Sequence, residues 1–149
     1  PLFSVTGDLF IGQRTTLFTT GLVAGIDPLV LPGDIRPIFA EGKLRIVDAS
    51  PASGVVDVYV LAAGSLITDQ VPTLQNLALR SATPYLPFFP RNYTVTFTVA
   101  GEKTVLATAE VAAAPGTVQT AVLVDAVRVD ALSDGKPAAV LLLDDRATL

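Results

Sequence analysis

Apolar and polar side chains alternate along most of the chain with a period of two. The clearest stretch is 91–100, where one face carries Tyr93, Val95, Phe97 and Val99 and the other carries Asn92, Thr94, Thr96 and Thr98. This period is typical of β-strands, and β-branched and aromatic residues suit a pleated, half-buried surface. The same pattern predicts strands at 15–23, 29–36, 43–48, 55–61, 104–111, 117–124, 127–132 and 138–143. For 73–80 a strand is favoured over a short helix capped by Thr73.

Turn residues separate these segments. We expect a hairpin tip at 100–103, type II turns at 31–34 and at Pro115-Gly116, and a tight hairpin at 133–135. The segment 84–90 holds three prolines, which exclude a central strand. It is therefore expected to be an ordered apolar loop or an edge segment.

Seven or more short strands with frequent turns predict an all-β protein, an antiparallel immunoglobulin-like β-sandwich. We expect the sandwich module at 43–149 and an N-terminal strand or hairpin extension at 1–42. The predicted core is Leu44, Ile46, Val56, Val58, Val60, Tyr93, Val95, Phe97 and Val99.

The N-terminal extension resembles the C-terminal part of the chain. In both, a β-rich strand (15–23 or 117–124) leads to an apolar strand, an acidic stop and an arginine, Arg36 or Arg146. Any two hairpins share such a pattern, so chance explains it as well as a repeat does. On the second explanation, 1–42 is the trailing part of a preceding repeat. It would complete a neighbouring module, extend a sheet or pair with another chain, because a lone hairpin is only marginally stable.

Composition narrows the classes of function. Half of the 149 residues are hydrophobic, only 16% are charged, and the mean hydropathy is +0.56. This excludes a disordered chain and indicates that part of the surface is covered by a neighbour. No run of about 18 apolar residues predicts a membrane-spanning helix. No charged-then-apolar signal peptide starts the chain and Pro1 is not an initiator residue, so a mature or trimmed product is expected. The net charge of −4 argues against nucleic-acid binding.

The chain has neither histidine nor cysteine, which removes the commonest general base, the commonest metal ligand and any disulfide. We therefore expect no catalytic residues, no cofactor and no metal site. Asp125, Asp130, Asp134, Asp144 and Asp145 do not match the spacing of a calcium loop, and solvated strand ends are expected instead. Asp57 is expected either on the solvent face or accepting backbone bonds at the turn 50–54. Asp48 or Ser50 is expected to bond the backbone of its own turn.

Two sequence motifs resemble a known family. They are the strand and turn from Lys43 to Pro51, ending in Ala49-Ser50-Pro51, and the Val56-Asp57-Val58-Tyr59 strand that follows. With Tyr93-Thr94-Val95 and the closing Leu143-Asp144-Asp145, they resemble the bacterial domain-of-unknown-function family DUF4397 over about 43–145. The resemblance implies a β-sandwich in secreted and cell-surface proteins, often in tandem, and no established activity. The chain has Asp48 where the family usually has histidine.

These observations favour a non-catalytic extracellular module with a structural or adhesive role, in the form of a self-assembling fibre subunit. Its mechanism would be strand pairing and apolar contact with a neighbouring repeat or another copy. The alternative is a binding module for glycan, peptide or protein through the aromatic and proline-rich segment 84–90, which would otherwise cover the core. The candidate interface residues are Tyr85, Leu86, Phe88, Phe89, Leu17 and Phe18.

Overall fold

The computed structural model describes residues 4, 6, 14–21, 25–126 and 137–146. In this part of the chain the regular elements are strands. They are β1 (Arg14–Thr20), β2 (Asp27–Gly33), β3 (Gly42–Asp48), β4 (Val56–Ala62), β5 (Leu74–Leu77), β6 (Leu86–Phe88), β7 (Arg91–Val99), β8 (Val105–Ala113), β9 (Val118–Asp125) and β10 (Ala138–Asp144). None of the described residues forms a helix long and apolar enough to cross a membrane. The expected strand at 127–132 and turn at 133–135 lie outside the described residues.

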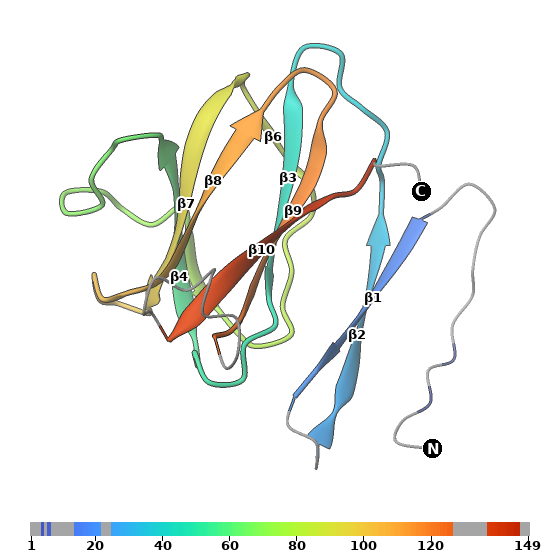
Figure 1. The fold of residues 1–149 in the computed structure, drawn as a ribbon, viewed down its shortest axis with the longest axis vertical. Helices are drawn as coiled ribbons and strands as arrows, with labels where there is room; N and C mark the ends of the chain where they lie inside the picture. The colour runs from blue at the N-terminus through green and yellow to red at the C-terminus, as the bar shows by residue number, and fades with distance from the viewer. Residues whose placement is uncertain (1–3, 5, 7–13, 22–24, 127–136, 147–149) are drawn as a thin grey trace.

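Two four-stranded sheets face each other and form the predicted sandwich (Figure 1). Their strand orders are β10-β9-β3-β6 and β5-β4-β7-β8. The predicted antiparallel sandwich is confirmed, with one exception to antiparallel pairing, because β3 runs parallel to β9. Parallel neighbours need a long crossover, and here the connection consists of all the strands from β4 to β8. The first sheet is therefore mixed, and the second is antiparallel.

The core lies between the two sheets and confirms the alternation that the sequence shows. Every predicted core residue is buried except Val99, which is partly buried against the same cluster. Leu106, Ala107, Val111, Ala121, Leu123, Ala138 and Val140 complete it. Inward-facing side chains therefore come from both sheets, as sandwich packing requires.

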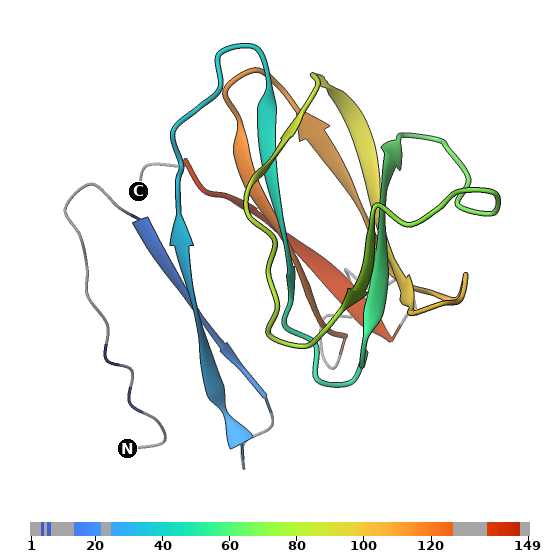
Figure 2. The ribbon, with the colours of Figure 1, turned by 180° about the vertical axis from the view of Figure 1, so that it is seen from behind.

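The strands β1 and β2 form a separate two-stranded antiparallel sheet. Figures 1 and 2 show it on the side of the sandwich formed by β3 and β9, away from β4 and β7. The type II turn expected at 31–34 is wrong, because Pro32 and Gly33 continue β2 in register with β1. Proline is compatible with an edge strand whose nitrogen points away from its partner, which explains the difference.

The turns predicted at 100–103 and at Pro115-Gly116 and the predicted edge segment are confirmed. Gly116 and Gly101 adopt the positive φ angles of 77° and 76° that their turns need. The segment 84–90 contains β6, a three-residue edge strand paired with β3. The segment 73–80 contains β5 and is not helical.

Candidate functional site

The aromatic segment 84–90 divides between the interior and the surface. The Tyr85 hydroxyl donates to Asp145 Oδ2 at 2.9 Å, and the Arg45 guanidinium lies 4.6 Å from the centre of its ring. Phe88 packs edge-on against Tyr93, with ring centres 5.2 Å apart, while Leu86 is half-buried. Phe89 is 68% exposed. Of this predicted interface, Phe89 alone is a large apolar side chain that is mostly exposed.

A buried polar network lies on the outer side of the β3–β9 pair. Arg45 is 2% exposed, and its Nη2 lies 4.0 Å from the Asp145 carboxylate. Asp145 Oδ2 also accepts the hydroxyl of Thr120, at 2.5 Å. Solvation at the strand end, as expected from the sequence, is therefore wrong for Asp145. Its donors come from three separate strands or loops, and the spacing of acidic residues gives no signal of that.

This network continues into the β1–β2 hairpin. Arg45 Nη2 donates to the Thr16 hydroxyl at 3.4 Å, and Arg14 donates to the backbone carbonyl of Asp145. At the other end of β1, Arg80 donates to the Thr20 hydroxyl and pairs with Asp27, both at 2.9 Å. The hairpin is thus docked on the outer face of the β10-β9-β3-β6 sheet.

Strand alternation assigns the two faces of the docked hairpin. Thr16 and Thr20 both bond arginines of the sandwich, so Phe18 between them points toward the sandwich and is half-buried. Leu17 points the other way and is 51% exposed. Its cross-strand partner Val30 is 43% exposed. Of the two predicted interface residues in β1, only Leu17 lies on the open face.

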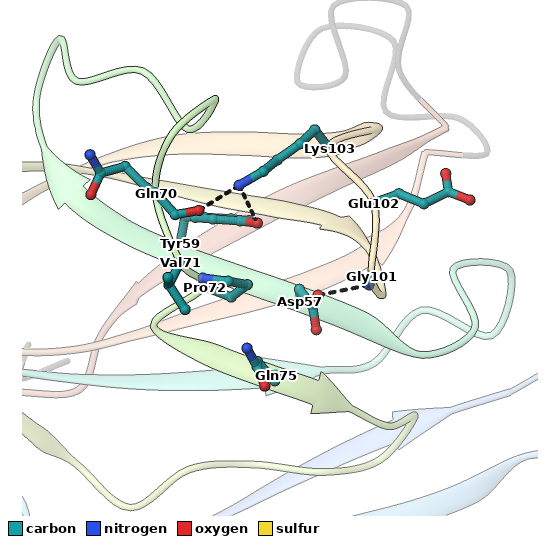
Figure 3. A pocket seen from close by; sticks show the side chains of 9 residues that line it. All are labelled: Asp57, Tyr59, Gln70, Val71, Pro72, Gln75, Gly101, Glu102 and Lys103. Carbon is teal, nitrogen blue, oxygen red and sulfur yellow. Dashed lines mark hydrogen bonds between the residues drawn. The ribbon is translucent and has the colours of Figure 1, made fainter.

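A pocket of about 260 Å³ lies beside β4, in the sheet that does not carry the hairpin (Figure 3). Its lining residues are Asp57, Tyr59, Gln70, Val71, Pro72, Gln75, Gly101, Glu102 and Lys103. Lys103 Nζ donates to the Tyr59 hydroxyl at 2.9 Å and to the carbonyls of Ile67 and Gln70 at 2.7 and 2.5 Å. Three acceptors match the three protons of the ammonium group, so Lys103 fixes the loop 63–73 to β4.

Asp57 holds the same region from inside. It is 4% exposed and accepts the backbone N–H groups of Asn76 and Gly101, each at 2.8 Å. Both sequence-based expectations for Asp57, solvent exposure and bonding at the turn 50–54, are wrong. Asn76 has a positive φ of 55°, and this bond stabilises that uncommon conformation. The Asp57–Tyr59 motif therefore organises the loops around the pocket.

A second acidic site lies where β3 and β9 end. Asp48 Oδ1 accepts the Ser50 N–H at 2.9 Å, which confirms the predicted turn, and Ser50 donates its hydroxyl to Asp125. Asp48 is fully buried, and its Oδ2 has no hydrogen-bond partner among the described residues. Burial raises the pKa of Asp48 to about 6, and the nearby charge of Asp125 adds to the rise. Within the described ranges, no group of three or more acidic side chains is arranged to hold a metal ion.

A family model described as Domain of unknown function (DUF4397) matches residues 42–149. The chain belongs to the DUF4397 family. The match begins at the first residue of β3, so the DUF4397 module coincides with the sandwich and leaves the β1–β2 hairpin outside. No curated protein matches the chain.

The two motifs that carry the resemblance have structural roles in this DUF4397 module. Ser50 and its turn connect β3 to β9 through Asp48 and Asp125. Asp57 and Tyr59 connect β4 to the loop 63–73 and to the hairpin tip at Gly101. Both motifs fix loops to strands through hydrogen bonds to the protein itself.

Proposed function

We propose that this chain is a non-catalytic structural module of the cell surface, which joins similar modules by strand pairing and apolar contact. One observation carries the proposal: the β1–β2 hairpin stands outside both sheets of the sandwich and exposes Leu17 and Val30 side by side. An apolar sheet face beside an open strand edge is a surface that another chain or module can cover.

The polar chemistry of the described residues supports a structural role. Lys103 and Asp57 line the pocket, but their hydrogen bonds hold the surrounding loops. The Arg45–Asp145 pair lies beneath the hairpin and joins it to the sandwich. The sequence contains no histidine and no cysteine, and the Lys103 ammonium group is occupied by three acceptors of the protein.

The proposed location is outside the cell, as the resemblance to secreted and surface proteins implies. An assembly that grows through one hairpin face and a different acceptor surface on the next copy is head-to-tail. Such contacts build open filaments unless their rotation closes a ring. The proposal therefore includes a fibre as the assembled form.

Sedimentation velocity over a range of concentrations tests this function. We expect the average mass of the wild-type chain to rise with concentration and Leu17→Asp to remain monomeric, because a charge on the open face opposes burial. Leu66→Asp is the matched control, since Leu66 is 78% exposed on the loop 63–73, far from the hairpin, and should associate like wild type. A wild-type monomer at every concentration would contradict the proposal.

A further inference from the structure

The β1–β2 hairpin repeats the plan of the β9–β10 hairpin at its last turn. Asp34 directly follows β2, and its Oδ1 accepts the N–H of Arg36 at 3.1 Å. Asp144 ends β10, and its Oδ1 accepts the N–H of Arg146 at 3.0 Å. Each hairpin thus ends in the same Asp-x-Arg turn, with the same hydrogen bond.

Superposing these turns also superposes the strand registers. The pair Arg14–Gly33 then falls on Thr120–Leu143, and the next five pairs of one hairpin fall on pairs of the other. In this alignment Leu17–Val30 falls on Leu123–Val140. Leu123 and Val140 are 0% and 9% exposed in the core of the sandwich, against 51% and 43% for Leu17 and Val30. The exposed pair Leu17–Val30 therefore corresponds to a pair that is buried in the core of the sandwich.

The opposite face of the hairpin agrees with this assignment. Thr16 and Phe18 fall on Val122 and Val124, which point away from the core between the sheets. The hairpin is therefore docked on the sandwich with the face that corresponds to the outer face of β9. Its other face, with Leu17, corresponds to a core face but is exposed to solvent in this structure.

The edges of the hairpin indicate which strand accepts a partner. Pro28 and Pro32 interrupt β2, and prolines are tolerated where their nitrogens point away from the paired strand. The edge of β2 opposite β1 thus lacks two N–H donors, as suits a terminal strand, and β10 is also terminal in its sheet.

The edge of β1 that faces away from β2 is open, and β1 contains no proline. Because Thr15 and Thr19 lie opposite the two prolines, antiparallel geometry directs the backbone groups of Thr15, Leu17 and Thr19 to this edge. Leu123, which aligns with Leu17, directs its backbone to the corresponding edge of β9. There its carbonyl accepts the N–H of Ala49, the residue that follows the parallel strand β3, at 2.9 Å.

We infer that β1 and β2 are the last two strands of a second sandwich of this fold. Its remaining strands, equivalent to β3–β8, cover Leu17 and Val30, and its β3-like strand pairs in parallel with the open edge of β1. The inference rests on the proposed function only in taking the open face of the hairpin as the joint. It specifies the partner as a preceding copy of the fold, which the hairpin completes.

An extended chain tests this assignment. Residues 42–119 are placed ahead of residues 14–149, with Arg45→Thr in the added segment so that no second arginine faces Arg14. The sequence contains no cysteine, so Leu17→Cys gives a single thiol reporter. We expect its labelling to slow by about 100-fold relative to the 149-residue chain, because reaction then requires local opening. The control is Leu66→Cys in the part 14–149, which should react equally in both chains.

Thr19→Pro in the extended chain separates strand pairing from simple crowding. It removes an N–H from the open edge of β1 and leaves the bonds to β2 intact, so fast labelling of Leu17→Cys should return. Unchanged labelling in the extended chain, folded or not, would overturn the assignment. The labelling rates of the two chains are compared at a concentration at which the 149-residue chain sediments as a monomer, so that association between identical chains does not slow the reaction. Protection in the extended chain alone supports the assignment even if the 149-residue chain does not associate.

Discussion

The Asp48 carboxylate is fully buried, and its Oδ2 has no hydrogen-bond partner among the described residues. Its pKa is raised to about 6, so the folded state holds a proton more tightly than the unfolded chain does. The neutral form is therefore favoured by folding. Its contribution to stability is full below about pH 4 and is lost as the pH rises through about 6.

Asp48→Asn should remove this pH dependence. The free energy of unfolding of the variant relative to wild type should rise by about 2 kcal/mol between pH 4 and pH 7, because each pKa unit corresponds to about 1.4 kcal/mol. Urea denaturation at each pH measures it. Asp69→Asn, at an exposed carboxylate, is the control and should show no such change. An Asp48→Asn difference that is flat over this range would show that Asp48 is ionised as readily in the folded state as in the unfolded one.

Phe88 and Phe89 are adjacent and identical in chemistry, yet the structure gives them opposite roles. Phe88→Ala should lower the free energy of unfolding by about 3 kcal/mol, because the ring packs against Tyr93 and the core. Phe89→Ala should change it by less than about 0.5 kcal/mol, since the ring is mostly in solvent. Equal losses in thermal or urea denaturation would show that Phe89 is also part of the core.

At the scale of elements, the loop 63–73 depends on contacts from outside its own sequence. Lys103 of the β7–β8 hairpin tip donates to two of its carbonyls, and the Thr73 hydroxyl accepts the N–H of Val60 in β4 at 2.9 Å. The loop presents Leu66 and Val71, both at least 75% exposed, from a fixed backbone.

Lys103→Met should loosen this loop while the sheets stay intact. It removes three charge-assisted hydrogen bonds, and we expect faster amide exchange at Gln70, whose N–H donates to the Ile67 carbonyl at 3.1 Å. Exchange at core amides such as Val95 should follow only the global stability. Glu102→Gln, at the adjacent position, is the control. Unchanged exchange at Gln70 would mean that the loop is ordered without Lys103.

The elements divide into those that local pattern predicts and those that it does not. Alternation identified β7 and its buried face, because each inward residue meets the same apolar core. The parallel pairing of β3 with β9 could not be found this way, since both neighbours show the same period whatever their direction. The turn expected at Pro32-Gly33 failed because the same dipeptide also fits an edge strand.

The candidate site was less predictable than the fold. Asp57 and Asp145 look like surface carboxylates in sequence, because their donors lie 19 or more residues away along the chain. The apolar excess in the composition did point to a covered surface, but only the structure shows that Leu17 faces outward while Phe18 faces the sandwich.

At the scale of the whole molecule, the chain has three layers, which are the two sheets of the DUF4397 sandwich and the hairpin docked outside them. Arginines at both ends of β1 fix the third layer, so its open face is held in a defined orientation. A module whose apolar joint is held in this way on one side is suited to assembly in series.

Negative-stain electron microscopy of the purified wild-type chain and of Leu17→Asp at matched, high concentration tests that claim most directly. We expect elongated serial assemblies for the wild type and dispersed single particles for Leu17→Asp. Single particles for both proteins, or the same assemblies for both, would contradict it.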